Sequence, residues 1–169
     1  MDDLIYCQRD IPKAQWRYGF RSSAATGCGW IATYNALRLM DCPADPVKLI
    51  RYYERQLPLI HGNAGTLALA PLLYFKSRGF HAEHTARYDR FDALAKASDV
   101  SVMFYYWRSK WKLGAHFVTV SYKDGVFTGY NTYSNSTGPD PYGPSLAGFV
   151  KKKKYFGAVL IGIKKRENM

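Results

Sequence analysis

The chain has 169 residues, 47% of them apolar, which is enough to bury one hydrophobic core, so we predict a single domain over residues 1–169. Its three cysteines, at positions 7, 28 and 42, match neither a disulfide framework nor paired zinc-ligand spacing, and no apolar run reaches the roughly 20 residues that span a bilayer. The formal charge of +11 is spread along the chain, whereas nucleic-acid binding needs a contiguous patch, so we expect no nucleic-acid partner.

Helical signals occupy the first half of the chain. Apolar periodicity predicts four helices, over residues 28–40, over 46–57, from a cap at Asn63 or Thr66 to residue 78, and over 90–97. Asp45 followed by Pro46 is a cap with proline in the first turn, and Gly79 is a typical helix end. The first helix begins directly after a Gly-Cys-Gly turn, which places Cys28 at its N-terminus.

Strand signals occupy the second half. Enrichment in Val, Ile, Phe and Tyr predicts four strands, over residues 100–106, 116–122, 126–130 and 156–163. The segment Lys123-Asp124-Gly125 joins the second strand to the third as a hairpin, because Asp-Gly supplies the positive backbone angles of tight turns. Helices followed by antiparallel strands predict an α+β fold, with N-terminal helices packed on a C-terminal antiparallel sheet.

Cys28 has the local setting of a nucleophile. The dipole of a helix N-terminus lowers the pKa of a thiol, and small neighbours at Gly27 and Gly29 would leave the sulfur reachable. The backbone amide of Cys28 would also point toward an oxyanion formed next to its own sulfur. An inert, buried thiol beside a helix cap is the alternative.

A thiolate nucleophile needs a base, and the base needs an orienting group. His116 opens a predicted strand and Asn131 ends the return strand of the hairpin, so the two residues are predicted to lie side by side. We expect the Cys28 sulfur within about 4 Å of one His116 ring nitrogen, and the Asn131 side chain on the other. Taken alone, His116 is better explained as a core histidine and Asn131 as a turn residue, and their joint placement favours a triad.

Three segments of the chain resemble a known family. They are Gly27-Cys28-Gly29-Trp30-Ile31-Ala32, Gly114-Ala115-His116-Phe117-Val118-Thr119-Val120 and Tyr130-Asn131. Together they are similar to the papain-like cysteine peptidase clan, and within it to the bacterial peptidases that process double-glycine bacteriocin leaders. The resemblance covers roughly residues 15–135. It implies a papain-like fold with Cys28, His116 and Asn131 as the catalytic triad.

The sequence departs from this family at the oxyanion hole. The family has a side-chain donor, a glutamine, several residues before the cysteine, where Ser22 stands here. Gln15 is the candidate replacement if the segment 17–25 loops out, and Gln8 is further away still. Loss of such a donor lowers catalysis by a factor of roughly 100–1000. The family also often has Asp in place of Asn131, although Asn orients histidine in papain-type sites.

We therefore predict a cysteine peptidase or amidohydrolase that acts on a peptide or protein substrate through a thioester. An acyl or amine transferase on the same triad, and a catalytically silent peptide-binding domain, are the alternatives. No cofactor and no metal are expected, since His81 and His84 would point to opposite faces of a strand. No membrane partner is expected either, and with no secretory signal visible we expect a cytoplasmic location.

Overall fold

The computed structural model describes residues 4–56, 66–108 and 113–166 of an α+β fold. The helical elements are η1 (Gln8–Asp10), α1 (Ser23–Thr26), α2 (Cys28–Leu39), α3 (Pro46–Gln56), α4 (Ala70–Ser77), η2 (Tyr88–Arg90), α5 (Phe91–Lys96) and α6 (Leu146–Lys153). The strands are β1 (Arg17–Tyr18), β2 (Arg21–Ser22), β3 (His81–Thr85), β4 (Val100–Arg108), β5 (Leu113–Lys123), β6 (Val126–Tyr130), β7 (Asp140–Gly143) and β8 (Gly157–Lys164). None of the helices in these ranges is long and apolar enough to cross a bilayer.

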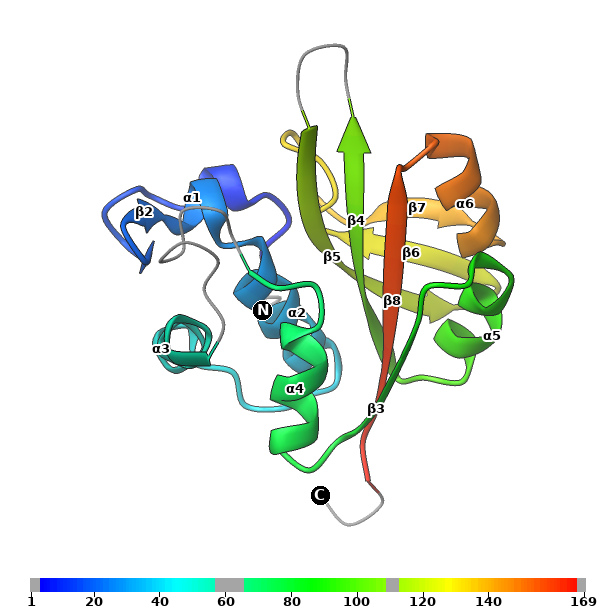
Figure 1. Ribbon diagram of the computed structural model, residues 1–169, viewed down its shortest axis with the longest axis horizontal. Coiled ribbons are helices and arrows are strands. Elements are labelled where there is room, and N and C mark those ends of the chain that lie inside the picture. The colour runs from blue at the N-terminus through cyan, green and yellow to red at the C-terminus, as the bar shows by residue number, and fades with distance from the viewer. Residues whose placement is uncertain (1–3, 57–65, 109–112, 167–169) are drawn as a thin grey trace.

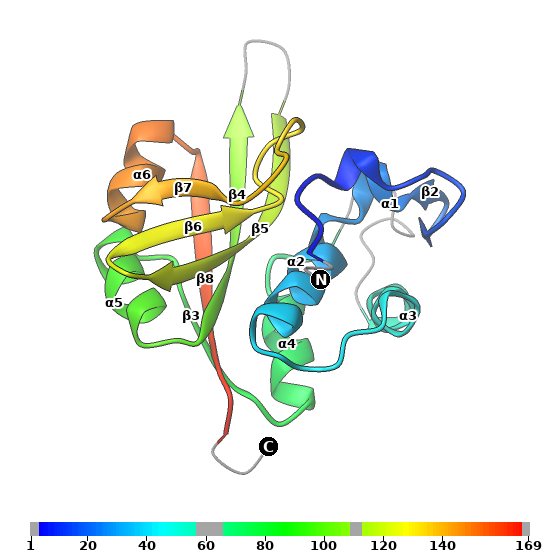
Figure 2. The same ribbon diagram turned by 180° about the vertical axis from the view of Figure 1, so that it is seen from behind.

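A six-stranded antiparallel sheet lies between two groups of helices, α1–α4 on one side and α5–α6 on the other (Figure 1). Its strand order is β3-β8-β4-β5-β6-β7, and β1 and β2 form a separate two-stranded sheet. Side chains alternate across the large sheet, so Phe104 and Phe117 join the core formed with α2–α4. Tyr105 and Val118 join the second core, formed with α5 and α6. Figure 2 shows the same two groups from behind.

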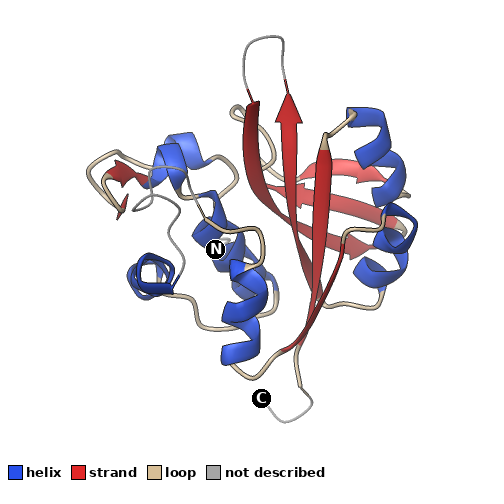
Figure 3. Cartoon of the chain, in the orientation of Figure 1, coloured by secondary structure: helices blue, strands red, loops and turns tan. Residues whose placement is uncertain are grey.

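Helix α2 is buried along most of its length and packs against β5 (Figure 3). Trp30 is fully buried, and its indole N–H donates to the hydroxyl of Ser23 at 3.0 Å. The hydroxyl of Thr119 on β5 donates to the carbonyl of Ala32 at 2.8 Å. These contacts join the first half of α2 to α1 and to the middle of β5.

The N-terminal segment connects the helices to the sheet. Asn35 on α2 accepts from the amide of Ile5 at 2.9 Å and donates to its carbonyl at 2.8 Å. Further along, the rings of Tyr6 and Tyr130 stack with their centroids 6.3 Å apart. The amide of Gln8 then donates to Asn131 Oδ1 at 2.8 Å. The segment therefore reaches both halves of the molecule.

The predicted helices and strands are confirmed with shifted ends. Helix α4 begins at Ala70, later than a cap at Thr66 would place it. The Thr66 hydroxyl instead bonds that of Tyr18 at 2.9 Å, and Pro71 occupies the first turn. Asn63 and the predicted end of the second helix near residue 57 lie outside the described residues.

Several short elements were not predicted from the sequence. Strand β3 is an edge strand of polar residues on which only Ala82 is buried, so it lacks the apolar signal of a strand. Helix α6 has a capping hydroxyl at Ser145, which accepts from Gly148 at 3.0 Å, but its buried residues are only Leu146 and Val150. Lys151, Lys152 and Lys153 form the last turn of this helix, and Lys154 is its C-cap.

We expect replacement of Asn35 by leucine to lower the free energy of unfolding by about 1–3 kcal/mol, because it leaves the amide and carbonyl of Ile5 without partners. Urea unfolding would measure the loss, with Arg51→Gln on the exposed face of α3 as a control expected to stay within about 0.5 kcal/mol. Unchanged stability of Asn35→Leu would show that the N-terminal segment is not held in this way.

Candidate active site

Cys28 is the first residue of α2, and its sulfur faces three main-chain amides. The amides of Cys28 and Gly29 belong to the open first turn of the helix, and the third is that of Phe117 on β5. These amides lower the pKa of the thiol, but burial is the larger effect and raises it above its ordinary value. The helix N-terminus therefore acts in the predicted direction, but burial outweighs it and favours the thiol form of Cys28.

The glycines around Cys28 are explained by close packing rather than by an opening for substrate. A Cβ atom on Gly27 would lie 2.6 Å from Nε1 of Trp30. On Gly29 it would lie 2.7 Å from the hydroxyl of Thr66. Any larger residue at either position would push α2 away from its neighbours.

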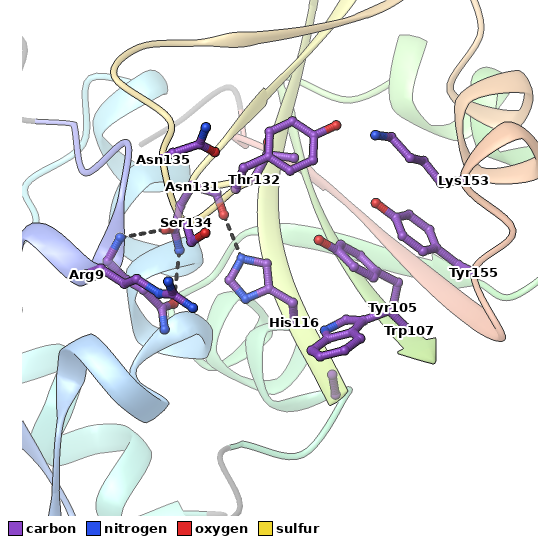
Figure 4. Close-up of a pocket in the computed structure, with 13 residues that line it drawn as sticks. Arg9, Tyr105, Trp107, His116, Asn131, Thr132, Ser134, Asn135, Lys153 and Tyr155 are labelled. Carbon is purple, nitrogen blue, oxygen red and sulfur yellow. Dashed lines mark hydrogen bonds between the residues drawn. The ribbon is translucent and has the colours of Figure 1, made fainter. Parts of the chain in front are cut away.

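His116 stands near the start of β5, and its tautomer is determined by one hydrogen bond. Its Nε2 lies 2.6 Å from the main-chain carbonyl oxygen of Asn131 (Figure 4). A carbonyl only accepts, so Nε2 carries the proton and Nδ1 keeps its lone pair. Among the described residues Nδ1 has no hydrogen-bond partner. Burial lowers the pKa of His116, against a smaller opposite effect of the carbonyl, so the ring is neutral at neutral pH.

Asn131 orients His116 through its main chain and not through its side chain, which corrects the prediction from the sequence. The residue has a φ of 60°, in the left-handed region that Asn tolerates better than most residues, and this turn directs its carbonyl at the ring. Its side chain faces Gln8. Oδ1 accepts from the Gln8 amide at 2.8 Å, and Nδ2 donates to Gln8 Oε1 at 3.4 Å.

The Cys28 sulfur lies at the part of β5 that has no pairing with β6. Strand β6 pairs with β5 only from Thr119 onward, so the Phe117 amide is left to face the Cys28 sulfur. Phe117 itself belongs to the α2 face of the sheet, and alternation assigns the neighbouring His116 to the other face. Among the described residues no hydrogen bond joins Cys28 to His116.

Gln15 does not stand at this site. It lines a separate hollow with Ile5, Pro12 and Ser136. Gln8, which is further from Cys28 in the sequence than Gln15, lines the pocket beside His116. Its Nε2 donates to the carbonyl of Ala24 on α1 at 3.1 Å. No sequence signal identifies Gln8, because its pairing with Asn131 joins positions 123 residues apart.

A pocket of about 520 Å³ opens beside His116 (Figure 4). Its aromatic lining includes Tyr105, Trp107 and Tyr155, and its charged lining consists of Arg9 and Lys153. A Cβ atom on Gly114 would collide with the Trp107 ring, which covers this glycine. Gly114 therefore lets Trp107 form one wall of the pocket.

Neither a metal site among the described residues nor a relative indicates the chemistry of the site. Within the described ranges no group of three or more His, Cys, Asp or Glu side chains is placed to hold a metal ion, and His81 pairs with Glu83 at the surface. A comparison with protein-family models finds no match, and a search of curated proteins finds no relative. The geometry around Cys28 and His116 is therefore the remaining indication of function.

For His116 we expect the Nε2–H tautomer at pH 7 and a titration midpoint below 6.5, because burial disfavours the charged ring. The unfolded chain then binds this proton more readily than the folded one, so the stability that His116 contributes is lost as the pH falls below about 6.5. Two-dimensional ¹⁵N NMR of histidine-labelled protein reports both the tautomer and the midpoint. An Nδ1–H tautomer, or a midpoint above 6.5, would contradict the assignment.

Proposed function

We propose that the chain is a papain-like thiol hydrolase of peptide or amide bonds. The observation that carries the proposal is the hydrogen bond from His116 Nε2 to the carbonyl of Asn131, which leaves Nδ1 as a base. His116 directly precedes Phe117, whose main-chain amide faces the Cys28 sulfur. The resemblance of the surrounding segments to the papain-like clan supports the same conclusion.

The reaction would begin from a neutral pair. As the Cys28 sulfur attacks the substrate carbonyl carbon, the thiol proton passes to Nδ1 of His116 and the carbonyl oxygen becomes an oxyanion. Collapse of this intermediate breaks the carbon–nitrogen bond, and Nδ1 returns the proton to the departing amine. Water then attacks the thioester with His116 again as base, which releases the carboxylic acid and restores the thiol.

The oxyanion would be bound by the amides at the start of α2, those of Cys28 and Gly29. Gln8, and not Gln15, would supply the side-chain donor of the oxyanion hole. Its side-chain nitrogen carries two hydrogens, and the carbonyl of Ala24 uses one of them. The second is left for an oxyanion in the cleft, with Asn131 holding the glutamine in position.

A catalytically silent peptide-binding domain is the second candidate. It is favoured by two observations, the raised pKa of the Cys28 thiol and the lack of a hydrogen bond between Cys28 and His116 among the described residues. Acyl transfer to an amine uses the same thioester as hydrolysis, and the two differ only in whether water or an amine reaches it.

A mixed peptide library analysed by mass spectrometry tests the proposal. We expect cleavage by the wild-type chain, with Cys28→Ala and His116→Gln each slower by about a thousandfold or more, because each removes a member of the proton-transfer pair. Cys42→Ser provides the control thiol and should cleave normally. Binding of peptides without cleavage would instead identify a silent domain, and an amide product formed with added amine would identify a transferase.

Gln8→Ala and Asn131→Gly are expected to lower kcat by about 100-fold each, because both release the same oxyanion donor. The double variant should be no slower than either single one, since the residues act as a unit. Glycine keeps the left-handed turn at position 131, so the His116 tautomer should persist in the ¹⁵N spectrum. Loss of that tautomer in Asn131→Gly would show that the side chain orients His116 after all.

A further inference from the structure

The pocket beside His116 lies on the face of the sheet that α5 and α6 cover, away from the core against which Cys28 packs. Tyr105 on β4 and Lys153 on α6 line it together with His116, whereas Cys28 is not among its lining residues. Its walls come from β4, β5, α6 and the segments around Arg9 and Asn131 (Figure 4). A molecule reaching from the Cys28 sulfur into this pocket therefore passes His116.

The charged groups of the pocket have one sign. Arg9 and Lys153 line it, and no acidic residue of the described chain does. Neither cation forms an ion pair with a described residue. The Lys153 ammonium lies over the rings of Tyr133 and Phe149, 4.8 Å and 5.6 Å from their centroids, which places it at the pocket wall. The pocket therefore offers positive charge without an internal counter-ion.

The tyrosine pair adds a hydroxyl donor to this charge, because Tyr105 donates to Tyr155 and the O–H of Tyr155 is left over. The rings of Tyr105 and Tyr155 stack with centroids 4.0 Å apart. Burial raises the pKa of Tyr155 to about 12 and that of Tyr105 further, so both stay protonated at neutral pH. Cations, a phenolic O–H group and the Trp107 ring together suit an anionic group carried on an apolar or aromatic body.

The position of the pocket determines which part of a substrate enters it. In the proposed reaction the acyl group stays on Cys28, and His116 gives its proton to the departing amine. The part of the substrate beyond His116 is then the amine side of the broken bond. We propose that this pocket holds the leaving-group side of the substrate and selects leaving groups that carry a carboxylate, with Lys153 and Arg9 as the selecting residues. This inference rests on the proposed function.

The carboxylate can come from a peptide C-terminus or from an acidic side chain, and four probes separate the sources. Gly-Phe and Gly-Phe amide test the terminal carboxylate, and Gly-Glu amide and Gly-Gln amide test the side chain. Binding is measured by NMR titration or calorimetry on Cys28→Ser protein, so that it does not depend on turnover. Lys153→Met removes one cation, Lys153→Arg keeps the charge, and Lys151→Met on the same turn of α6, outside the pocket, is the matched control.

We expect at least one carboxylate probe to bind about fivefold more tightly than its uncharged partner at low salt. The difference should disappear in Lys153→Met and persist in Lys153→Arg and Lys151→Met. In the Cys28-containing chain, Lys153→Met should lower kcat/KM for peptides with an acidic group on the amine side of the cleaved bond. Peptides with that group on the acyl side should be unaffected.

Equal binding of carboxylate and amide probes would overturn the inference, as would a preference that survives Lys153→Met. So would Lys153-dependent binding of a single-stranded oligonucleotide without any carboxylate preference. Cleavage with no preference on the amine side would overturn the inference and leave the proposed hydrolase intact. Carboxylate binding in a wild-type chain that performs no Cys28 chemistry would overturn the proposed function and the leaving-group role together, while the anion preference of the pocket would stand.

Discussion

The hydrogen bond from His116 Nε2 to the carbonyl of Asn131 is the constraint on which the chemistry of the site depends. It assigns the proton to one ring nitrogen and leaves the other as a base. The register of β5 with β6 and the left-handed turn at Asn131 bring the carbonyl to the ring. Because the same turn directs the Asn131 side chain at Gln8, the orientation of the base and the position of the N-terminal segment are coupled.

Cys28 and His116 are both partly buried, and this burial shifts their titration in opposite directions. Burial raises the pKa of Cys28 and lowers that of His116, so both side chains are neutral at neutral pH. Amides aimed at the sulfur oppose this effect and are already in place, so they need no rearrangement when negative charge develops there.

Local signals in the sequence account for most of the fold and for part of the site. Helical periodicity after Cys28 and the Asp-Gly turn between β5 and β6 are properties of neighbouring residues, and both predictions are confirmed. Which atom of Asn131 meets His116 depends on one backbone angle that composition does not reveal. Gln8 reaches the site through contacts with distant residues, and the lysines at the end of α6 obscure a helix whose buried face is only Leu146 and Val150.

The sheet order has a consequence for when the site comes into being. Strand β8 lies between β3 and β4, although it follows both by many residues in the chain. During synthesis, β3 therefore cannot join the sheet before residues 157–164 have been made, because β8 is its only partner strand among the described residues. Such non-local pairing slows folding, because a long loop must close before its contacts are gained. Lys153 and Tyr155, which line the pocket, lie just before β8, so the pocket is complete only once this late part of the chain has been made.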